Sequence, residues 1–143
     1  MIRHYISEDI PAVLEIWLLA SIEAHHFIPE TFWEGKLQEM EKVYIPKSTT
    51  YVYQDLERQK VIGFISLVGN FIAALFVSPQ QQGEGVGTTL LEFVKKKFSK
   101  LELTVYCKNN SAVHFYKKRG FQIIQESIDE NTKQQEYTMQ YLP

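Results

Sequence analysis

The chain has 143 residues, of which 45% are hydrophobic and 22% are charged, and its formal net charge is −2. A chain of this length and balance can bury one hydrophobic core, so we expect a single domain over residues 1–143. The charge argues against a general nucleic-acid binder, no apolar run is long enough for a membrane span, and one cysteine excludes a disulfide framework. These features predict a cytoplasmic protein without a metal site.

Hydrophobic periodicity divides the chain into strands and helices. Alternating, β-branched and aromatic segments predict strands at residues 2–6, 49–56, 61–68, 71–77, 101–106, 121–128 and 135–142. Helical spacing predicts helices at residues 10–24, 30–44, 86–98 and 109–118. Pro46 is expected to end the second helix, and Gly63 to mark a bulge. The predicted fold is α/β, a mixed sheet of six to seven mostly antiparallel strands with about four helices.

Basic residues gather in one part of the chain. Between Gly85 and Gly120 there are eight basic and only two acidic residues, so the remaining chain is strongly acidic. A basic segment suits a polyanionic ligand, and the acidic remainder suits a cationic one. Ordinary solvated helix faces are the alternative, which we favour for Lys95, Lys96 and Lys97.

The most informative stretch joins the strand at residues 71–77 to the following helix. Gly83, Gly85 and Gly87 lie between them, after a proline-containing turn. Glycines let the backbone approach a ligand closely, and the free N–H groups of a helix start attract anions, most often phosphate. The alternative is a tight strand-to-helix turn that binds nothing.

Two familiar phosphate loops fit this stretch poorly. A P-loop requires Lys and then Ser or Thr after its last glycine, but Thr88 follows Gly87 directly. A dinucleotide fingerprint requires a third glycine where Thr88 stands. A nucleotide or dinucleotide binder is therefore the weaker of the phosphate-binding alternatives.

The pattern that fits the loop is Q-x-x-G-x-G, given by Gln82, Gly85 and Gly87. It resembles the coenzyme A pyrophosphate loop of the GNAT superfamily of acyl-CoA N-acyltransferases. The later pattern N-x-x-A-x-x-x-Y-x-x-x-G-F, from Asn109 to Phe121, resembles the cofactor-binding helix of the same family. Together with the strand order, the resemblance covers most of the chain after Tyr51, and the N-terminal part is similar to the small bacterial YjaB-type branch.

The resemblance implies acetyl-CoA as the donor of an acetyl group. Backbone N–H groups of the strand end would hold the pantetheine arm and the thioester oxygen, those of the glycine turn the pyrophosphate, and Asn109 would lie beside the pantetheine. The implied cofactor-binding residues are Leu75, Phe76, Val77, Gln82, Gly83, Glu84, Gly85, Val86, Gly87, Thr88 and Asn109. Tyr116 would be catalytic, protonating the departing thiolate, since a phenol is protonated at neutral pH.

The acceptor side is less well defined by the sequence. The implied reaction moves the acetyl group to a primary amine of a small molecule or peptide, and the amine must lose a proton before it attacks. The strand at residues 71–77 has no carboxylate to take that proton. His25 or His26 could take it, since His titrates near neutrality, or the proton could pass to water. Residues at the end of the first helix and in the loop after it are expected to line the acceptor pocket. These are Trp17, His25, His26 and Phe27.

Two function classes therefore stand for the same fold. One is an acetyl-CoA-dependent N-acetyltransferase, which Tyr116 favours. The other is a non-catalytic acyl-CoA-binding sensor, which would bind the cofactor without transferring its acetyl group. The general base, the identity of the acceptor and the choice between monomer and homodimer stay open at this point.

Overall fold

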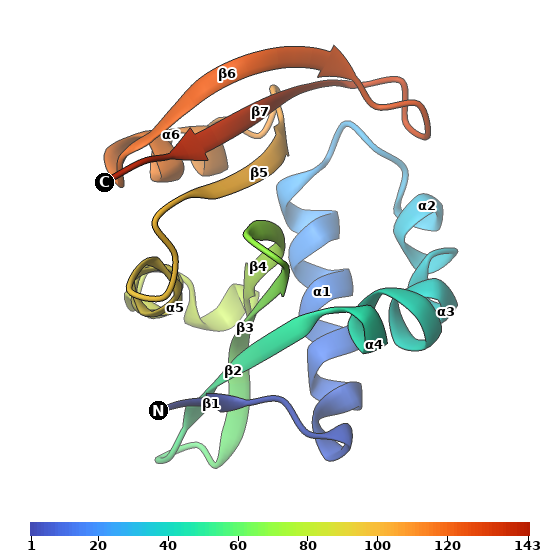
Figure 1. The fold of residues 1–143 in the computed structure, drawn as a ribbon. Coiled ribbons are helices and arrows are strands. Elements are labelled where there is room, and N and C mark those ends of the chain that lie inside the picture. The colour runs from blue at the N-terminus through green and yellow to red at the C-terminus, as the bar shows by residue number, and fades with distance from the viewer.

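The computed structural model describes residues 1–143 and contains one mixed sheet of seven strands (Figure 1). The strands are β1 Ile2–His4, β2 Thr49–Asp55, β3 Lys60–Val68, β4 Phe71–Val77, β5 Leu101–Tyr106, β6 Phe121–Ile128 and β7 Gln135–Tyr141. Their order across the sheet is β1-β2-β3-β4-β5-β7-β6, and only β4 and β5 run parallel. The predicted mixed, mostly antiparallel sheet is confirmed.

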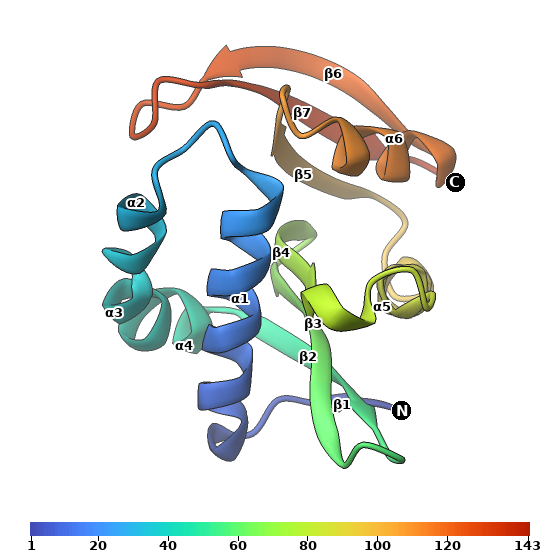
Figure 2. The same ribbon diagram turned by 180° about the vertical axis from the view of Figure 1, so that it is seen from behind.

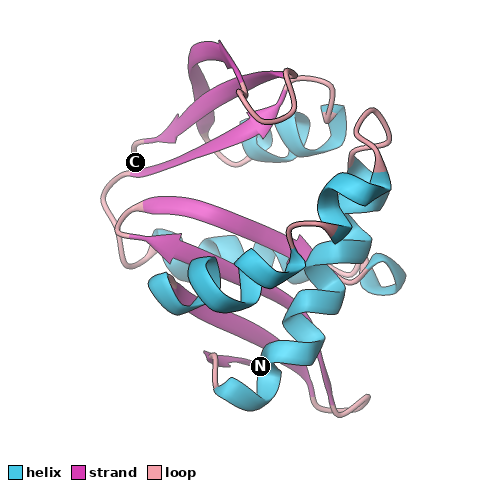
Figure 3. Ribbon diagram, turned by 90° about the vertical axis from the view of Figure 1, so that its right-hand side faces the viewer, coloured by secondary structure: helices cyan, strands magenta, loops and turns pink.

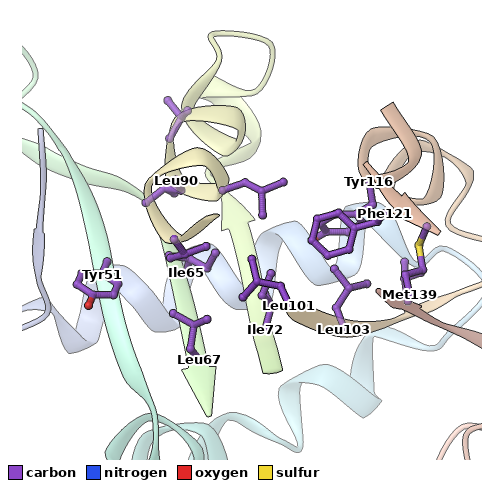
Figure 4. Packing of buried hydrophobic residues seen from close by; sticks show 14 of the residues in the cluster. Tyr51, Ile65, Leu67, Ile72, Leu90, Leu101, Leu103, Tyr116, Phe121 and Met139 are labelled. Carbon is purple, nitrogen blue, oxygen red and sulfur yellow. The ribbon is translucent and has the colours of Figure 1, made fainter. Parts of the chain in front are cut away.

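Helices cover both faces of this sheet, as the front and back views show (Figures 1 and 2). Helix α1, Ile10–Ala24, contributes Val13, Ile16 and Trp17 to one core cluster. Helices α5, Val86–Lys95, and α6, Asn110–Lys118, contribute to the other cluster, around Leu90, Leu101 and Phe121 (Figure 4). Burial on both faces explains why the central strand β3 is almost continuously apolar. None of the helices combines the length and apolar character that crossing a membrane requires.

The second predicted helix, residues 30–44, is broken. Helix α2, Glu30–Glu34, ends at Gly35, because glycine is a poor helix former. The chain then winds through α3, Leu37–Glu39, a π-helical turn over Met40–Tyr44, and α4, Ile45–Lys47. Pro46 does not end the run as expected, because it lies in the first turn of α4, where a missing N–H costs little.

Strands β4 and β5 pair only where they begin. Phe71 pairs with Glu102 and Ile72 with Leu103, and no pairing follows. The register of β4 against β3 shifts at Ala73, and such a bulge bends its strand. The two parts of the sheet therefore diverge beyond this point (Figure 3), and the β5-facing backbone groups of residues 74–77 have no partner strand.

A second bulge lies next to Gly63, as predicted, because Tyr53 pairs with Gly63 and Gln54 pairs with Val61. A Cβ atom at Gly63 would lie 2.9 Å from Cγ1 of Val86. Glycine at this position thus allows the first residue of α5 to pack directly against β3.

Candidate active site

A cleft of about 490 Å³ lies where β4 ends, between the glycine turn and α6. Ten of the eleven predicted cofactor-binding residues line it, namely Leu75, Phe76, Val77, Gln82, Gly83, Gly85, Val86, Gly87, Thr88 and Asn109. Glu84 does not line the cleft, because its carboxylate is turned toward Arg58, with 3.3 Å between Oε1 and Nη1. We call this cavity the cofactor cleft.

The floor of the cofactor cleft carries free backbone donors. Gly83 and Gly85 have φ values of +86° and +84°, a conformation that side chains other than glycine rarely adopt. The first helical bond of α5 runs from Thr89 N–H to the Gly85 carbonyl, so the N–H groups of residues 86–88 donate to no backbone carbonyl. No side chain caps this helix start. Free N–H groups at a helix start are the donors that an anion site requires.

Arg119, which the sequence motifs did not single out, is the one basic residue lining the cofactor cleft. Its Nη2 donates to Oγ1 of Thr88 at 2.7 Å and its Nη1 to the Phe115 carbonyl at 3.0 Å. The guanidinium carbon lies 3.8 Å from the Phe115 ring centroid. The excess of basic residues between Gly85 and Gly120 indicated a positive charge near the cleft, but it did not indicate which residue supplies the charge. Lys117 and Lys118, beside Arg119 in sequence, are exposed and do not line the cleft.

A second cavity of about 480 Å³ opens where β4 and β5 diverge, and we call it the acceptor cavity. Beside the strand edges, its walls are aromatic and acidic. These residues are Trp17, Trp33, Tyr44, Tyr106, Asp129 and Glu136. Five residues line both cavities, so the two meet at Leu75, Phe76, Asn109, Ala112 and Tyr116.

Two of the four predicted acceptor residues line the acceptor cavity and two do not. Trp17 and His25 line the acceptor cavity. Phe27 lies outside it but packs its ring against those of His25 and Tyr106, with centroids 5.7 and 5.8 Å apart. His26 is exposed and lines neither cavity, because the chain leaves the helix at this point and turns its side chain outward.

His25 is buried, stacked on the Trp33 ring at a centroid distance of 5.0 Å. Burial lowers the pKa of His25 to about 4, so the imidazole is neutral at physiological pH. Its Nε2 lies 3.3 Å from the side-chain amide of Asn109. Such an imidazole is a weak base, and a positioning role fits it better than proton abstraction.

Tyr116 stands at the junction of the two cavities. It projects from α6 and packs against Phe121, with ring centroids 5.4 Å apart (Figure 4). Its hydroxyl makes no hydrogen bond within the protein, and burial raises the pKa of the phenol above its usual range. Asn109 holds this helix in place, because its Oδ1 accepts a hydrogen bond from the Ala112 N–H at 3.3 Å and caps the helix.

Asp129 and Glu136 are the carboxylates of the acceptor cavity, and the sequence analysis missed both. Glu136 lies opposite Tyr106 in the β5–β7 pairing, and the Tyr106 hydroxyl donates to Oδ2 of Asp129 at 2.6 Å. No local motif marks these residues. Their place at the site depends on how the C-terminal hairpin pairs with β5.

A comparison with protein families matches residues 46–123 to the acetyltransferase (GNAT) domain. Among curated proteins, the peptidyl-lysine N-acetyltransferase YiaC of Escherichia coli is 33% identical over 93% of this chain and 90% of its own length. The peptidyl-lysine N-acetyltransferase YjaB of Escherichia coli is 32% identical over 85% of this chain and 79% of its own length.

Solved structures agree with these sequence matches. The solution structure of apo-form YjaB from Escherichia coli has a TM-score of 0.86 and 27% identity, covering 99% of this chain and 96% of its own. The PaiA N-acetyltransferase of Thermoplasma acidophilum, solved in complex with coenzyme A, has a TM-score of 0.80 over 100% of this chain and 98% of its own. At 19% identity it shows the shared fold alone. The predicted family and fold class are both confirmed, and the chain belongs to the GNAT superfamily and is an acyltransferase.

Proposed function

We propose that this protein is an acetyl-CoA-dependent N-acetyltransferase whose acceptor is the side-chain amine of lysine in a peptide or protein. The observation that carries the proposal is the meeting of two separately lined cavities at Tyr116. The relatives named as peptidyl-lysine N-acetyltransferases support lysine as the acceptor.

The residues of the cofactor cleft fit coenzyme A. The free N–H groups at the start of α5 and the guanidinium of Arg119 suit its pyrophosphate. The unpaired β5-facing edge of β4, residues 74–77, suits the amide groups of the pantetheine arm, which can pair with it as a further strand does. An N–H group of this edge can also donate to the thioester oxygen as negative charge develops there. Bound at this site, acetyl-CoA would supply the activated acetyl group.

Tyr116 is proposed as the donor to the leaving sulfur. Its phenol stays protonated throughout the physiological pH range, since burial raises its pKa. The same shift makes the phenol a weaker acid, so donation of a hydrogen bond to the thiolate contributes more than early proton transfer. Asn109 and His25 keep the helix that carries Tyr116 against the end of α1.

The test is release of free thiol from acetyl-CoA with a lysine-containing peptide whose N-terminal amine is blocked. Thiol release and a mass increase of one acetyl group on the lysine are expected. A second peptide with a free N-terminus and no lysine, and spermidine, are the comparison acceptors. Transfer only to these comparison acceptors would contradict lysine as the acceptor.

The alternative is a non-catalytic acyl-CoA sensor. Coenzyme A would then raise the melting temperature by mass action, as it would for an enzyme. With every acceptor tested, the rate of thiol release from acetyl-CoA would then equal the rate measured without protein. That pair of results would overturn the enzymatic proposal and leave the cofactor site in place.

A further inference from the structure

Resting on the proposed function, we propose that Glu136 binds the ammonium group of the acceptor and takes its proton before attack on the thioester. The strand that ends in the cofactor cleft offers no carboxylate for this task, and the neutral His25 is a weak base. Glu136 and Tyr116 line the same cavity, so the acceptor nitrogen can pass from one to the other without leaving it.

The two carboxylates of the acceptor cavity differ in their hydrogen bonds. Asp129 accepts from the Tyr106 hydroxyl at 2.6 Å, the Asn131 N–H at 3.0 Å and the Thr132 hydroxyl at 3.0 Å. Although burial favours its protonated form, these bonds hold the pKa of Asp129 below its usual value. Its lone pairs are thus occupied in shaping the β6–β7 turn. Glu136 makes no hydrogen bond or ion pair through its side chain and is free to receive one.

The pairing of β7 with β5 fixes where Glu136 lies. Glu136 is directly opposite Tyr106, and directly opposite residues of neighbouring strands project from the same face of a sheet. Tyr106 lines the acceptor cavity from that face. The neighbouring pair, Val105 and Tyr137, projects from the opposite face. Val105 is buried in the other core cluster and also lines the cavity, but Tyr137, which is next to Glu136 in sequence, lines neither cavity. A shift of one residue in register would therefore remove the carboxylate from the cavity.

The rest of the cavity suits an aliphatic ammonium ion. It is lined by no Lys or Arg, and Trp17, Trp33 and Tyr44 present aromatic surface that attracts both methylene groups and cations. Two polar atoms of the lining residues, Nε1 of Trp33 and Nδ1 of His25, are buried without a hydrogen-bond partner. Unpaired buried polar atoms are rare in native proteins and need an explanation. Both are N–H donors, so a carbonyl oxygen of the acceptor peptide can pair with them, whereas its ammonium group cannot.

The charges around Glu136 favour proton uptake. Burial and the nearby carboxylate of Asp129 raise the pKa of Glu136 above its ordinary value. The other titratable residues that line the cavity are Tyr106 from β5, Asp129 from the β6–β7 turn, His25 at the end of α1, Tyr44 and Tyr116. Glu136 also acts on Cys107, whereas Lys36 acts on Asp129. None of these donates a hydrogen bond to Glu136, so its proton affinity is raised without being offset by a fixed partner.

The proton balance of the reaction is as follows. The ammonium gives one proton to the Glu136 carboxylate, and the neutral nitrogen forms a bond to the thioester carbon. The carbon–sulfur bond then breaks, and the thiolate accepts a hydrogen bond and a proton from Tyr116. Tyr116 is reprotonated by the second proton lost from nitrogen. Glu136 releases its proton to solvent, so one amide, one thiol and one proton are formed from an ammonium ion and a thioester.

The experiment compares Glu136→Gln with the wild type over pH 7 to 10, using the blocked lysine peptide. At pH 7 only about one lysine in a thousand or fewer is a free amine, because its pKa is about 10.4. Removing the proton acceptor should lower kcat/KM about 100-fold at pH 7. The deficit should shrink to less than about tenfold near pH 10, because solvent then supplies the free amine. The Kd of coenzyme A, measured by calorimetry, should stay at the wild-type value.

Glu130→Gln is the matched control, since Glu130 lies in the same hairpin, is exposed and lines neither cavity. It should behave as the wild type. Glu136→Asp, which keeps a carboxylate, should recover part of the activity at pH 7. A Glu136→Gln deficit that is constant across pH, or no deficit, would overturn the inference while the wild-type activity upholds the proposed function. A wild type that releases no thiol with any acceptor would overturn the proposed function and the inference with it.

Discussion

The side-chain amide of Asn109 lies 3.3 Å from Nε2 of His25, joining the start of α6 to the end of α1 across 84 positions of sequence. The amide nitrogen is a donor, so Nε2 accepts and the imidazole proton resides on Nδ1. Oδ1 of the same Asn109 caps α6. One side chain thus links the helix that carries Tyr116 to the end of α1, where His25 follows the last helical residue.

His25 is expected to make stability depend on pH. Its folded-state pKa of about 4 lies below the value of 6.5 for an unperturbed His. Between these two pH values, His25 is protonated in the unfolded chain and neutral in the folded chain. Stability is then complete above pH 6.5 and declines as the pH falls toward 4. We expect the wild type to lose about 2–3 kcal/mol from this source between pH 7 and 4.5, measured by urea unfolding. His25→Gln should lack this component, and the exposed His26→Gln should retain it. Equal losses in the wild type and His25→Gln would contradict the assignment.

Gly87→Val is expected to weaken coenzyme A binding in a folded protein. A Cβ at this position meets Phe115 and Val77 at ordinary contact distances of 3.6 and 3.7 Å, so the domain has room for it. The added side chain projects at the lining of the cofactor cleft, and overpacking of about 1–3 kcal/mol corresponds to a loss of about 5-fold to 150-fold in affinity. Calorimetric titration measures it.

Gly69→Ala is the control, a glycine substitution that should reduce stability without changing coenzyme A affinity. Gly69 has a φ of +61° in a turn that lines neither cavity. The variant should lower the melting temperature and leave the coenzyme A affinity unchanged. An unchanged affinity in folded Gly87→Val would show that the cofactor does not pass over this helix start.

Arg119→Ala is expected to reduce coenzyme A affinity about tenfold or more, because charge-assisted hydrogen bonds contribute about 1.5–3 kcal/mol. The dependence of affinity on salt should also become weaker, since a cationic contact has been removed. Lys118→Ala is the matched control, being an exposed cation one residue away that lines no cleft. If both variants lose affinity equally, the effect is one of net charge and the specific role of Arg119 is wrong.

Tyr116→Phe is expected to lower kcat about 100-fold, near the lower end for loss of a general acid, because a thiolate leaves fairly well without help. The ring stays, so packing against Phe121 and the Kd of coenzyme A should change little. Tyr137→Phe, the same chemical change at a tyrosine outside both cavities, should keep wild-type kinetics. If Tyr116→Phe has the wild-type kcat and the chemical step is shown to limit the rate, the hydroxyl has no catalytic role and Tyr116 only packs in the core.

The cofactor side of the site was predictable because its information is local. Gly83, Gly85 and Gly87 lie within one turn, and Asn109 caps the helix that presents Tyr116 seven residues later. Strand and helix periodicities placed these segments to within a few residues. Because these patterns resemble the motifs of the GNAT superfamily, the resemblance predicted ten of the residues that line the cofactor cleft.

The acceptor side depends on long-range geometry that periodicity does not contain. His25 and His26 are adjacent in sequence, and only the last turn of α1 decides that the first is buried and the second exposed. Glu136 enters the cavity because β7 lies between β5 and β6 in the sheet, which no local pattern expresses. The break at Gly35 had a local signal, but the apolar spacing that continues after Gly35 predicted one unbroken helix.

The limited overlap of the two cavities has a kinetic consequence. Each cavity has its own lining, and they share only the five residues around Tyr116, so a bound donor leaves the aromatic and acidic walls of the other cavity uncovered. In the proposed reaction, donor and acceptor therefore occupy the protein together, and the acetyl group passes directly from sulfur to nitrogen. Double-reciprocal plots at several fixed donor concentrations should intersect, whereas an acetylated enzyme intermediate would make them parallel. The divergence of β4 from β5 would thus determine the order of chemical events as well as the shape of the site.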